Sequence, residues 1–176
     1  MKKIIGIWVL FCIAFSVKAQ QVRLGFGPEL LVPAGNSSNI SSIGGGLAAR
    51  AEVQVSGQFG LTGQIAYNHF IGRKYLGLRS DNLKYIPVKL GLKYYTDPKF
   101  YLEGNVGANL PQNNTEATSL AWSIGFGSQL GGRNADQFLD MGMRYEGWTK
   151  DKLMNVNGKY VTFGFIAFRL TYNFNL

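Results

Sequence analysis

Apolar and polar residues alternate along most of this chain. The clearest example runs from Ile166 to Leu176, where Phe168, Leu170 and Tyr172 alternate with small or polar residues. Successive side chains of a β-strand point to opposite faces of the sheet. The pattern therefore predicts a strand with one apolar face and one polar face.

The same alternation recurs in eight segments of the chain. They are Val22–Pro33, Gly45–Ser56, Phe59–Ile71, Leu83–Tyr95, Phe100–Leu110, Ser119–Leu130, Phe138–Trp148 and Tyr160–Phe174. These segments are longer than the usual strand of about 5 or 6 residues in a soluble protein. They reach the length of about 9–11 residues that a tilted strand needs to cross a bilayer.

The connections between these segments alternate between short and long. Residues 57–58, 96–99 and 131–137 are the short connections, and residues 34–44, 72–82, 111–118 and 149–159 are the longer ones. Outer-membrane barrels have short periplasmic turns and longer external loops. The sequence thus predicts an all-β protein, an eight-stranded antiparallel up-and-down transmembrane β-barrel with both termini in the periplasm.

One face of the predicted strands carries nearly all of their charged residues. These are Arg23, Glu29, Arg50, Glu52, Lys89, Lys93, Glu103, Asp140, Arg144, Glu146 and Arg169. A Lys or Arg side chain that faces lipid near the bilayer midplane costs about 2–4 kcal/mol. We therefore expect the charged face to line the lumen as a network of ion pairs, with the apolar face toward lipid. Lys84 is the exception on the apolar face, near a strand end.

Aromatic residues gather near the ends of the predicted strands, as in the girdles of membrane barrels. At the periplasmic side we expect Phe59, Tyr94, Tyr95, Phe100, Tyr101, Tyr172 and Phe174. At the opposite rim we expect Tyr67, Tyr85, Trp148 and Tyr160. A soluble periplasmic barrel of the lipocalin type is the alternative, with the two faces reversed around a ligand. The many glycines on the charged face favour a crowded lumen, and therefore a membrane barrel over a soluble barrel of the lipocalin type.

The N-terminus has the pattern of a secretory signal peptide. Lys2 and Lys3 precede an apolar run over residues 4–17, and a small-residue cleavage site ends at Ala19. We expect residues 1–19 to be removed and residues 20–176 to form one outer-membrane β-barrel domain. Cleavage would remove Cys12, the only cysteine. Of 18 Lys and Arg residues three lie in this leader, which leaves 15 basic against 10 acidic residues, dispersed and without a cluster for nucleic acid.

The candidates for enzymatic chemistry are few. His69 is the only histidine, and barrel enzymes that modify lipid A need a histidine beside a serine and an acid. The alternation places His69 on the lipid face, and the nearest serine in the sequence is Ser80 in the next loop. We therefore predict no catalytic residue, no metal and no cofactor, with a lipid A-modifying enzyme as the alternative. The basic loop at residues 72–82 is either solvated or in contact with lipopolysaccharide or a surface partner.

Three parts of the sequence carry a family resemblance: the leader ending Ala19-Gln20, the segment 85–95 (YIPVKLGLKYY) and the ending 168–174 (FRLTYNF). They resemble the PorT-like outer-membrane β-barrel family and, more broadly, the small OmpA/OmpX-like barrels. The resemblance implies an integral barrel of a Gram-negative-type outer membrane and no particular chemistry. Because eight strands leave too little room for an aqueous channel, we expect a filled lumen without an open pore and a structural or surface-interaction role. The resemblance also implies insertion by the barrel-assembly machinery, which reads an aromatic-ended last strand, and an accessory role in protein secretion as a further alternative.

Overall fold

The structure is a computed structural model that describes residues 22–75, 78–79, 82–112, 117–131, 136–150 and 161–176. The predicted leader lies outside the described residues, as do Tyr160 and Ser80.

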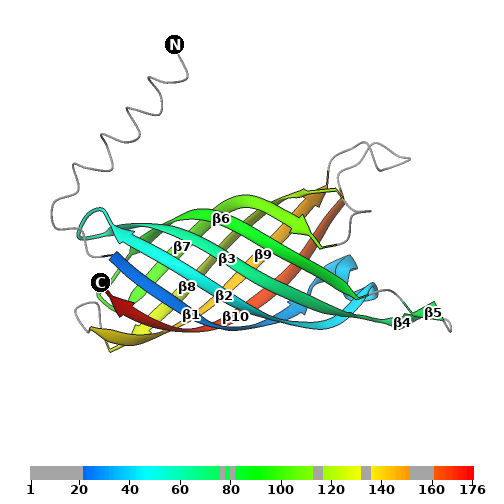
Figure 1. The fold of residues 1–176 in the computed structure, drawn as a ribbon, viewed down its shortest axis with the longest axis horizontal. Helices are drawn as coiled ribbons and strands as arrows, with labels where there is room; N and C mark the ends of the chain where they lie inside the picture. Colours follow the sequence, from blue (N-terminus) through cyan, green and yellow to red (C-terminus); the bar gives the residue numbers. More distant parts are fainter. Residues whose placement is uncertain (1–21, 76–77, 80–81, 113–116, 132–135, 151–160) are drawn as a thin grey trace, which may run out of the picture.

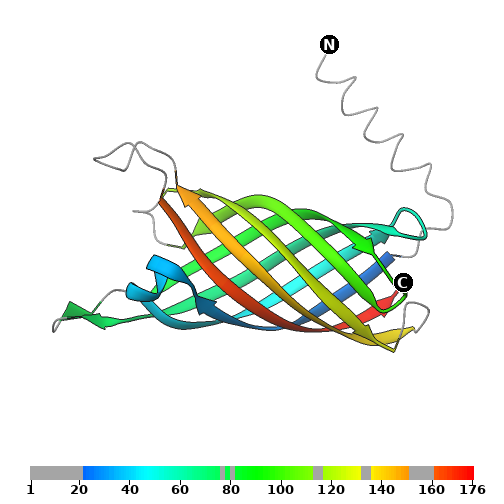
Figure 2. The same ribbon diagram turned by 180° about the vertical axis from the view of Figure 1, so that it is seen from behind.

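Eight long strands form the wall of the molecule. They are β1 (Val22–Pro33), β2 (Ser41–Gln54), β3 (Phe59–Gly72), β6 (Leu83–Tyr95), β7 (Phe100–Pro111), β8 (Ser119–Leu130), β9 (Gln137–Lys150) and β10 (Val161–Asn175). Each is antiparallel to its sequence neighbours, and β1 pairs with β10 to close the barrel (Figures 1 and 2). This confirms the predicted eight-stranded up-and-down barrel.

The two ends of the barrel differ in their connections. At one end, here called the short-turn end, lie the β2–β3, β6–β7 and β8–β9 connections together with the start of β1 and the end of β10. The opposite end, the long-loop end, carries the 3₁₀ helix η1 (Gly35–Asn39) and the small hairpin of β4 (Lys74–Tyr75) and β5 (Leu78–Arg79). Figure 1 shows the hairpin extending beyond the wall.

Helix η1 is tied to the wall by β10. The Gly164 amide donates to Ser37 Oγ at 2.9 Å, and the Ala34 amide donates to the Gly164 carbonyl at 2.9 Å. Gly35 has a φ of 58°, a left-handed conformation that glycine adopts without steric cost. The two bonds to Gly164 fix η1 against β10 at the long-loop end. Among the described residues, no α-helix is long and apolar enough to span a bilayer.

Strand β2 differs most from its prediction, since it begins four residues earlier than expected. The run Gly44-Gly45-Gly46, where the predicted strand begins, pairs throughout with β3 opposite residues 68–70. The pairing continues to Ser41 across an irregularity in register. At the C-terminal end of β2, the amides of Val55 and Ser56 both donate to the Phe59 carbonyl. Val55 and Ser56 therefore belong to the turn that leads to β3 and not to β2.

Pro28 and Pro87 lie inside β1 and β6 and cause no bulge. Pairing of β1 with β10 is interrupted opposite Pro28 and resumes in the same register at Glu29. Pairing of β3 with β6 is interrupted opposite Pro87 in the same way. Proline lacks the amide hydrogen that the neighbouring strand would accept. Each proline removes bonds on one side and leaves the register unchanged.

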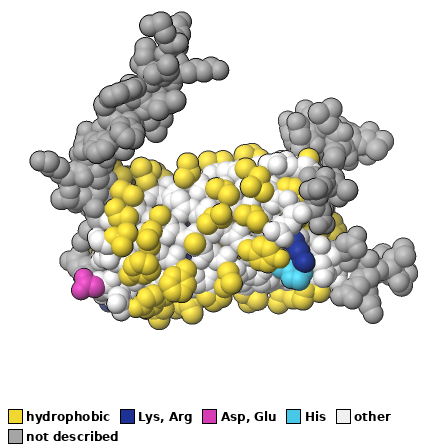
Figure 3. Space-filling view, viewed as in Figure 1, with side chains coloured by type: hydrophobic (Ala, Val, Ile, Leu, Met, Phe, Trp, Pro, Cys, Tyr) yellow, Lys and Arg dark blue, Asp and Glu magenta, His cyan; other side chains and the backbone are white. Residues whose placement is uncertain are grey.

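The outer wall is apolar and the inner wall is polar. Large hydrophobic side chains are exposed along every long strand, with Leu90 at 71% and Ile124 at 67%. Figure 3 shows hydrophobic side chains over most of one face of the barrel, with charged ones near its two ends. This is the orientation expected of a membrane barrel and the reverse of a lipocalin.

Candidate functional site

All eleven charged residues expected in the lumen are buried in the structure. Their exposed fractions range from 0% for Glu146 to 7% for Arg50. Each of the eleven takes part in at least one ion pair with another member of the set. The strands bring together side chains that are up to 115 positions apart in the sequence, such as Glu29 and Arg144.

Glu52 is the centre of the pairs nearest the short-turn end. Lys93 Nζ lies 2.8 Å from one of its carboxylate oxygens, and Arg23 lies 3.4 Å from the other. The Tyr95 hydroxyl donates to Glu52 and accepts from the side-chain amide of Gln129. The carboxylate of Glu52 is thus satisfied from two strands, β1 and β6.

Glu103 and Asp140 form the next layer of the interior. Arg50 contacts Glu103 at 2.5 Å, and Arg169 reaches Glu103 at 3.4 Å and Asp140 at 3.2 Å. The Tyr101 hydroxyl donates to Asp140 at 2.5 Å. Lys93 completes this layer at 3.2 Å from Asp140. One lysine therefore links two layers of the network.

Arg144 holds the third layer together. Its Nη1 and Nη2 each donate to one oxygen of Glu29 at 2.8 Å, and its Nε donates to Glu146 at 2.8 Å. Lys89 Nζ pairs with the same carboxylate of Glu146. Bidentate pairs between arginine and a carboxylate are among the strongest hydrogen-bonded pairs in proteins. Their geometry offsets part of the desolvation cost of burying these charges.

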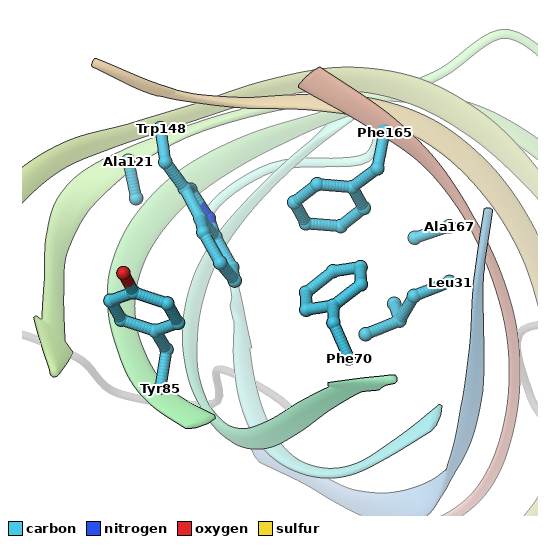
Figure 4. Close-up of a cluster of buried hydrophobic side chains, with 7 residues drawn as sticks. All are labelled: Leu31, Phe70, Tyr85, Ala121, Trp148, Phe165 and Ala167. Carbon is cyan, nitrogen blue, oxygen red and sulfur yellow. The ribbon is translucent and has the colours of Figure 1, made fainter. Parts of the chain in front are cut away.

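Above these layers, toward the long-loop end, the interior becomes aromatic. Figure 4 shows part of this group, here called the mouth cluster, with side chains that converge on the barrel interior; they come from β1, β3, β6, β8, β9 and β10. It consists of Leu31, Phe70, Tyr85, Ala121, Trp148, Phe163, Phe165 and Ala167. Trp148 touches Phe70, Tyr85, Phe163 and Phe165, with ring centroids 4.9–5.7 Å apart. Its indole Nε1 donates to Glu146 at 2.8 Å, which couples the mouth cluster to the charges below.

The expectation that Trp148 belongs to the membrane interface is wrong, because its side chain is only 3% exposed and lies inside the barrel. Tyr85, Tyr95 and Tyr101 are likewise buried. The physical reason was available in the alternation: Trp148 is two residues after Glu146 on the same strand, so both point inward. The position of Trp148 near a strand end suggested that it belongs to the aromatic girdle, but its side chain points to the inner face of the wall, and this direction determines its environment.

The other interface aromatics lie on the outer wall. Phe59, Tyr67, Tyr94, Phe100 and Tyr172 are exposed and Phe174 is half-buried. At the short-turn end Phe59 contacts Tyr94 with centroids 5.2 Å apart. Another outer pair, not predicted from the sequence, is Trp122 with Tyr145, with ring centroids 5.7 Å apart.

His69 lies on the outer wall, as the alternation predicts, and is half-buried. Its cross-strand neighbour is Lys84, which is exposed. Its Nε2 atom is buried and has no hydrogen-bond partner among the described residues. His69 therefore faces away from the acidic side chains of the interior. Over the described ranges, no group of three or more His, Cys, Asp or Glu side chains is arranged to hold a metal ion.

The barrel is closed by eight strands, each long enough to cross a bilayer, with an apolar outer surface and ion pairs inside. These features define the fold of small outer-membrane β-barrels. Comparison with solved structures agrees. Ail, the attachment invasion locus protein of Yersinia pestis, is similar with a TM-score of 0.59 and 14% identity, over 90% of this chain and 100% of Ail. Neisserial surface protein A (NspA) is similar at 0.55 and 12% identity, over 90% and 99%.

The outer membrane protein OprG from Pseudomonas aeruginosa is also similar, with a TM-score of 0.52 and 14% identity, over 90% of this chain and 97% of OprG. No protein-family model and no curated protein matches the sequence. At these identities the likeness shows the fold alone.

Proposed function

We propose that this chain is an integral outer-membrane β-barrel protein with a structural or surface-interaction role. The observation that carries the proposal is the separation of its faces: exposed apolar side chains along every long strand, and eleven buried, paired charges inside. Such a surface is stable in hydrocarbon and would aggregate in water.

The proposal includes a lumen without an open pore. It is supported by the three layers of ion pairs and the mouth cluster, whose side chains lie in the barrel interior. An eight-stranded barrel is just wide enough for side chains to fill it. In planar bilayers the purified protein should give no steady ohmic conductance, and a stable conductance step would contradict this part of the proposal.

A non-enzymatic role is supported by where the reactive groups lie. The acids of the interior are paired with Lys and Arg, and His69 lies on the opposite face of the wall. If the chain were instead a lipid A-modifying enzyme, a His69→Ala variant would lose a lipid A modification seen with the native chain. Unchanged lipid A in cells with the native chain, the variant or neither supports our proposal.

The partners proposed are lipids and proteins of the envelope. Lys84 is exposed near the long-loop end of the outer wall, and its ammonium group is the contact we propose for headgroup phosphates of lipopolysaccharide. Insertion would use the barrel-assembly machinery. An accessory role in secretion rests on the PorT-like resemblance only; a deletion strain with unchanged secreted proteins would remove it.

Membrane fractionation tests the location directly. We expect the protein in the outer-membrane fraction, extracted by detergent only, and with an N-terminus at Gln20 by mass spectrometry. Unboiled and boiled samples should migrate differently in a gel, since folded barrels resist detergent until heated. Recovery in the soluble periplasm, or identical mobilities, would refute the proposal.

A further inference from the structure

A groove of about 410 Å³ crosses β7, β8, β9 and β10 on the outer wall, and every residue that lines it lies within the described strands. These four strands are neighbours in the barrel and lie side by side in Figure 2. We propose that the groove binds one straight hydrocarbon chain of a membrane lipid. The proposal rests on the proposed membrane location and goes beyond it, because it assigns a bound lipid to one place on the wall.

Two cross-strand rows of side chains form the sides of the groove. One row is Leu102, Phe126 and Met143, and the other is Ile124, Tyr145 and Ile166. The rows are two residues apart along each strand, which is about 7 Å. Between them lies the cross-strand pair of Gly125 and Arg144. Residues at these alternate positions face the lumen, so the floor of the groove is strand backbone.

The width of the groove selects a single chain as its occupant. An α-helix with its side chains is about 10–12 Å across, which is too wide to lie between rows about 7 Å apart. One extended hydrocarbon chain is narrow enough. A cavity of about 150 Å³ holds benzene, so a groove of about 410 Å³ has room for a chain segment of on the order of ten carbons.

The lining offers no charge to a ligand. Arg144 is its only charged residue, and all three guanidinium nitrogens of Arg144 donate to Glu29 and Glu146 inside the barrel. The side chains that form the two rows contribute mainly carbon atoms, which attract a hydrocarbon chain through many small dispersion contacts. An acyl chain is the apolar molecule that surrounds an outer wall placed in hydrocarbon, and its headgroup would lie outside the groove.

The row that contains Tyr145 is held in place before a lipid arrives. The side chain of Tyr145 lies across Gly164, where an added Cβ would overlap its hydroxyl, and its ring centroid is 5.7 Å from that of Trp122. Trp122 lies in turn across Gly147, and its Nε1 donates to Thr149 Oγ1 at 3.2 Å. A side wall that is already ordered lowers the entropy that binding would cost.

Native mass spectrometry can count the lipids that bind to the full chain, folded in detergent and stripped of lipid. Two phosphatidylcholines with the same headgroup serve as probes, dipalmitoyl with straight chains and diphytanoyl with methyl-branched chains. We expect one dipalmitoyl lipid to bind with an affinity about tenfold higher than that of the diphytanoyl lipid, because methyl branches do not fit between the two rows.

Two matched substitutions on β9 locate the site. Met143→Trp places a larger side chain in the groove and should lower the affinity for the dipalmitoyl lipid about tenfold. Met141→Trp makes the same change two residues earlier, on the same outer face but outside the groove, and should leave the affinity unchanged. Heat-modifiable gel mobility shows whether each variant is folded.

Several results would overturn the inference. They are absence of a bound lipid, equal affinity for the two lipids, unchanged affinity in folded Met143→Trp, or an equal loss in Met141→Trp. A dimer that Met143→Trp abolishes, in place of a lipid adduct, would mean that a second copy covers the groove and would also overturn it. A protein that fractionates with the outer membrane but binds no lipid refutes this inference alone, whereas recovery in the soluble periplasm refutes the proposed function as well.

Discussion

Arg144 makes the most complete set of interactions in the barrel interior. All three of its guanidinium nitrogens donate to carboxylates, two to Glu29 and one to Glu146. Gln64 is the other side chain that donates to Glu29, at 3.2 Å. A single residue thus satisfies two buried acids from different strands.

Replacing this residue should leave Glu29 without a cation, while Glu146 keeps Lys89 and Trp148. We expect Arg144→Met to lower the free energy of unfolding by about 3–5 kcal/mol, because a buried charge left without its partner keeps its full desolvation cost. Urea titration of the protein in lipid vesicles measures the change. Lys84→Met, at an exposed site, should shift it by no more than about 0.5 kcal/mol.

A double variant separates charge from shape. Arg144→Met with Glu29→Gln removes both members of the bidentate pair and should be less destabilised than Arg144→Met alone, since one stranded charge is gone. Equal or greater loss in the double variant would mean that packing of the arginine, and not its charge, stabilises the interior.

Sequence alone predicted which residues would carry the interior charges but not how they pair. Alternation assigns Glu29 and Arg144 to the same face of the wall, yet their contact depends on strand tilt and on the register around the barrel. Trp148 shows the opposite case. Its inward direction was readable from Glu146, and it was misplaced because aromatic residues near strand ends are so often interfacial.

At the scale of the element, β7 shows how close approach restricts a strand. A Cβ added at Gly107 would lie 2.7 Å from Lys89 Cα and still closer to the Val88 carbonyl oxygen, both backbone atoms of β6. A Cβ added at Gly104, three residues earlier, meets nothing within 4 Å. The two glycines therefore have different roles on one strand.

Alanine at these positions should have opposite effects. Gly107→Ala must push β6 and β7 apart and should cost about 1–3 kcal/mol. Gly104→Ala should be neutral or stabilising by up to about 1 kcal/mol, because glycine in a strand interior loses more backbone entropy on folding than alanine does. Urea midpoints of the two variants in vesicles measure this difference, and similar midpoints would contradict it.

Strand positions were well predicted wherever a turn-forming sequence bounded the alternation. β1, β6 and β8 have the predicted bounds, whereas β2 was shifted by its glycine run. Glycine marks turns in isolated sequence, but here Gly44 and Gly46 lie against Phe70 and Asn68 of β3, where a side chain has no room. That reason depends on the neighbouring strand and is invisible in the local sequence. Neither η1 nor the β4–β5 hairpin was predicted, since both lie within long connections without alternation.

For the whole molecule, the direction of the two faces governs where it is stable. Leu90 lies near the middle of the outer wall, between Gly63 and Val106 on its neighbouring strands, and Leu110 lies one residue from the end of β7 at the long-loop end. Both are exposed in the protein alone.

An arginine at each position reports depth in the bilayer. Leu90→Arg should cost about 2–4 kcal/mol in vesicles and Leu110→Arg about 0–1 kcal/mol, because the penalty for arginine falls toward the interface. Unfolding titrations in vesicles give both values. If the two substitutions cost the same, the outer wall does not lie in hydrocarbon as proposed.

The seam between β1 and β10 joins the most distant parts of the described chain, such as Arg23 and Asn175, which are 152 positions apart. Until that seam forms, both flanking strands expose a row of unpaired amides and carbonyls that hydrocarbon cannot satisfy. A partly formed barrel that lacks the β1–β10 pairing is therefore not stable in the bilayer. A polypeptide truncated before its final strand should remain outside the bilayer, where it would aggregate and be degraded by proteases. Quality control of this protein would thus depend on a single event, the pairing of β10 with β1.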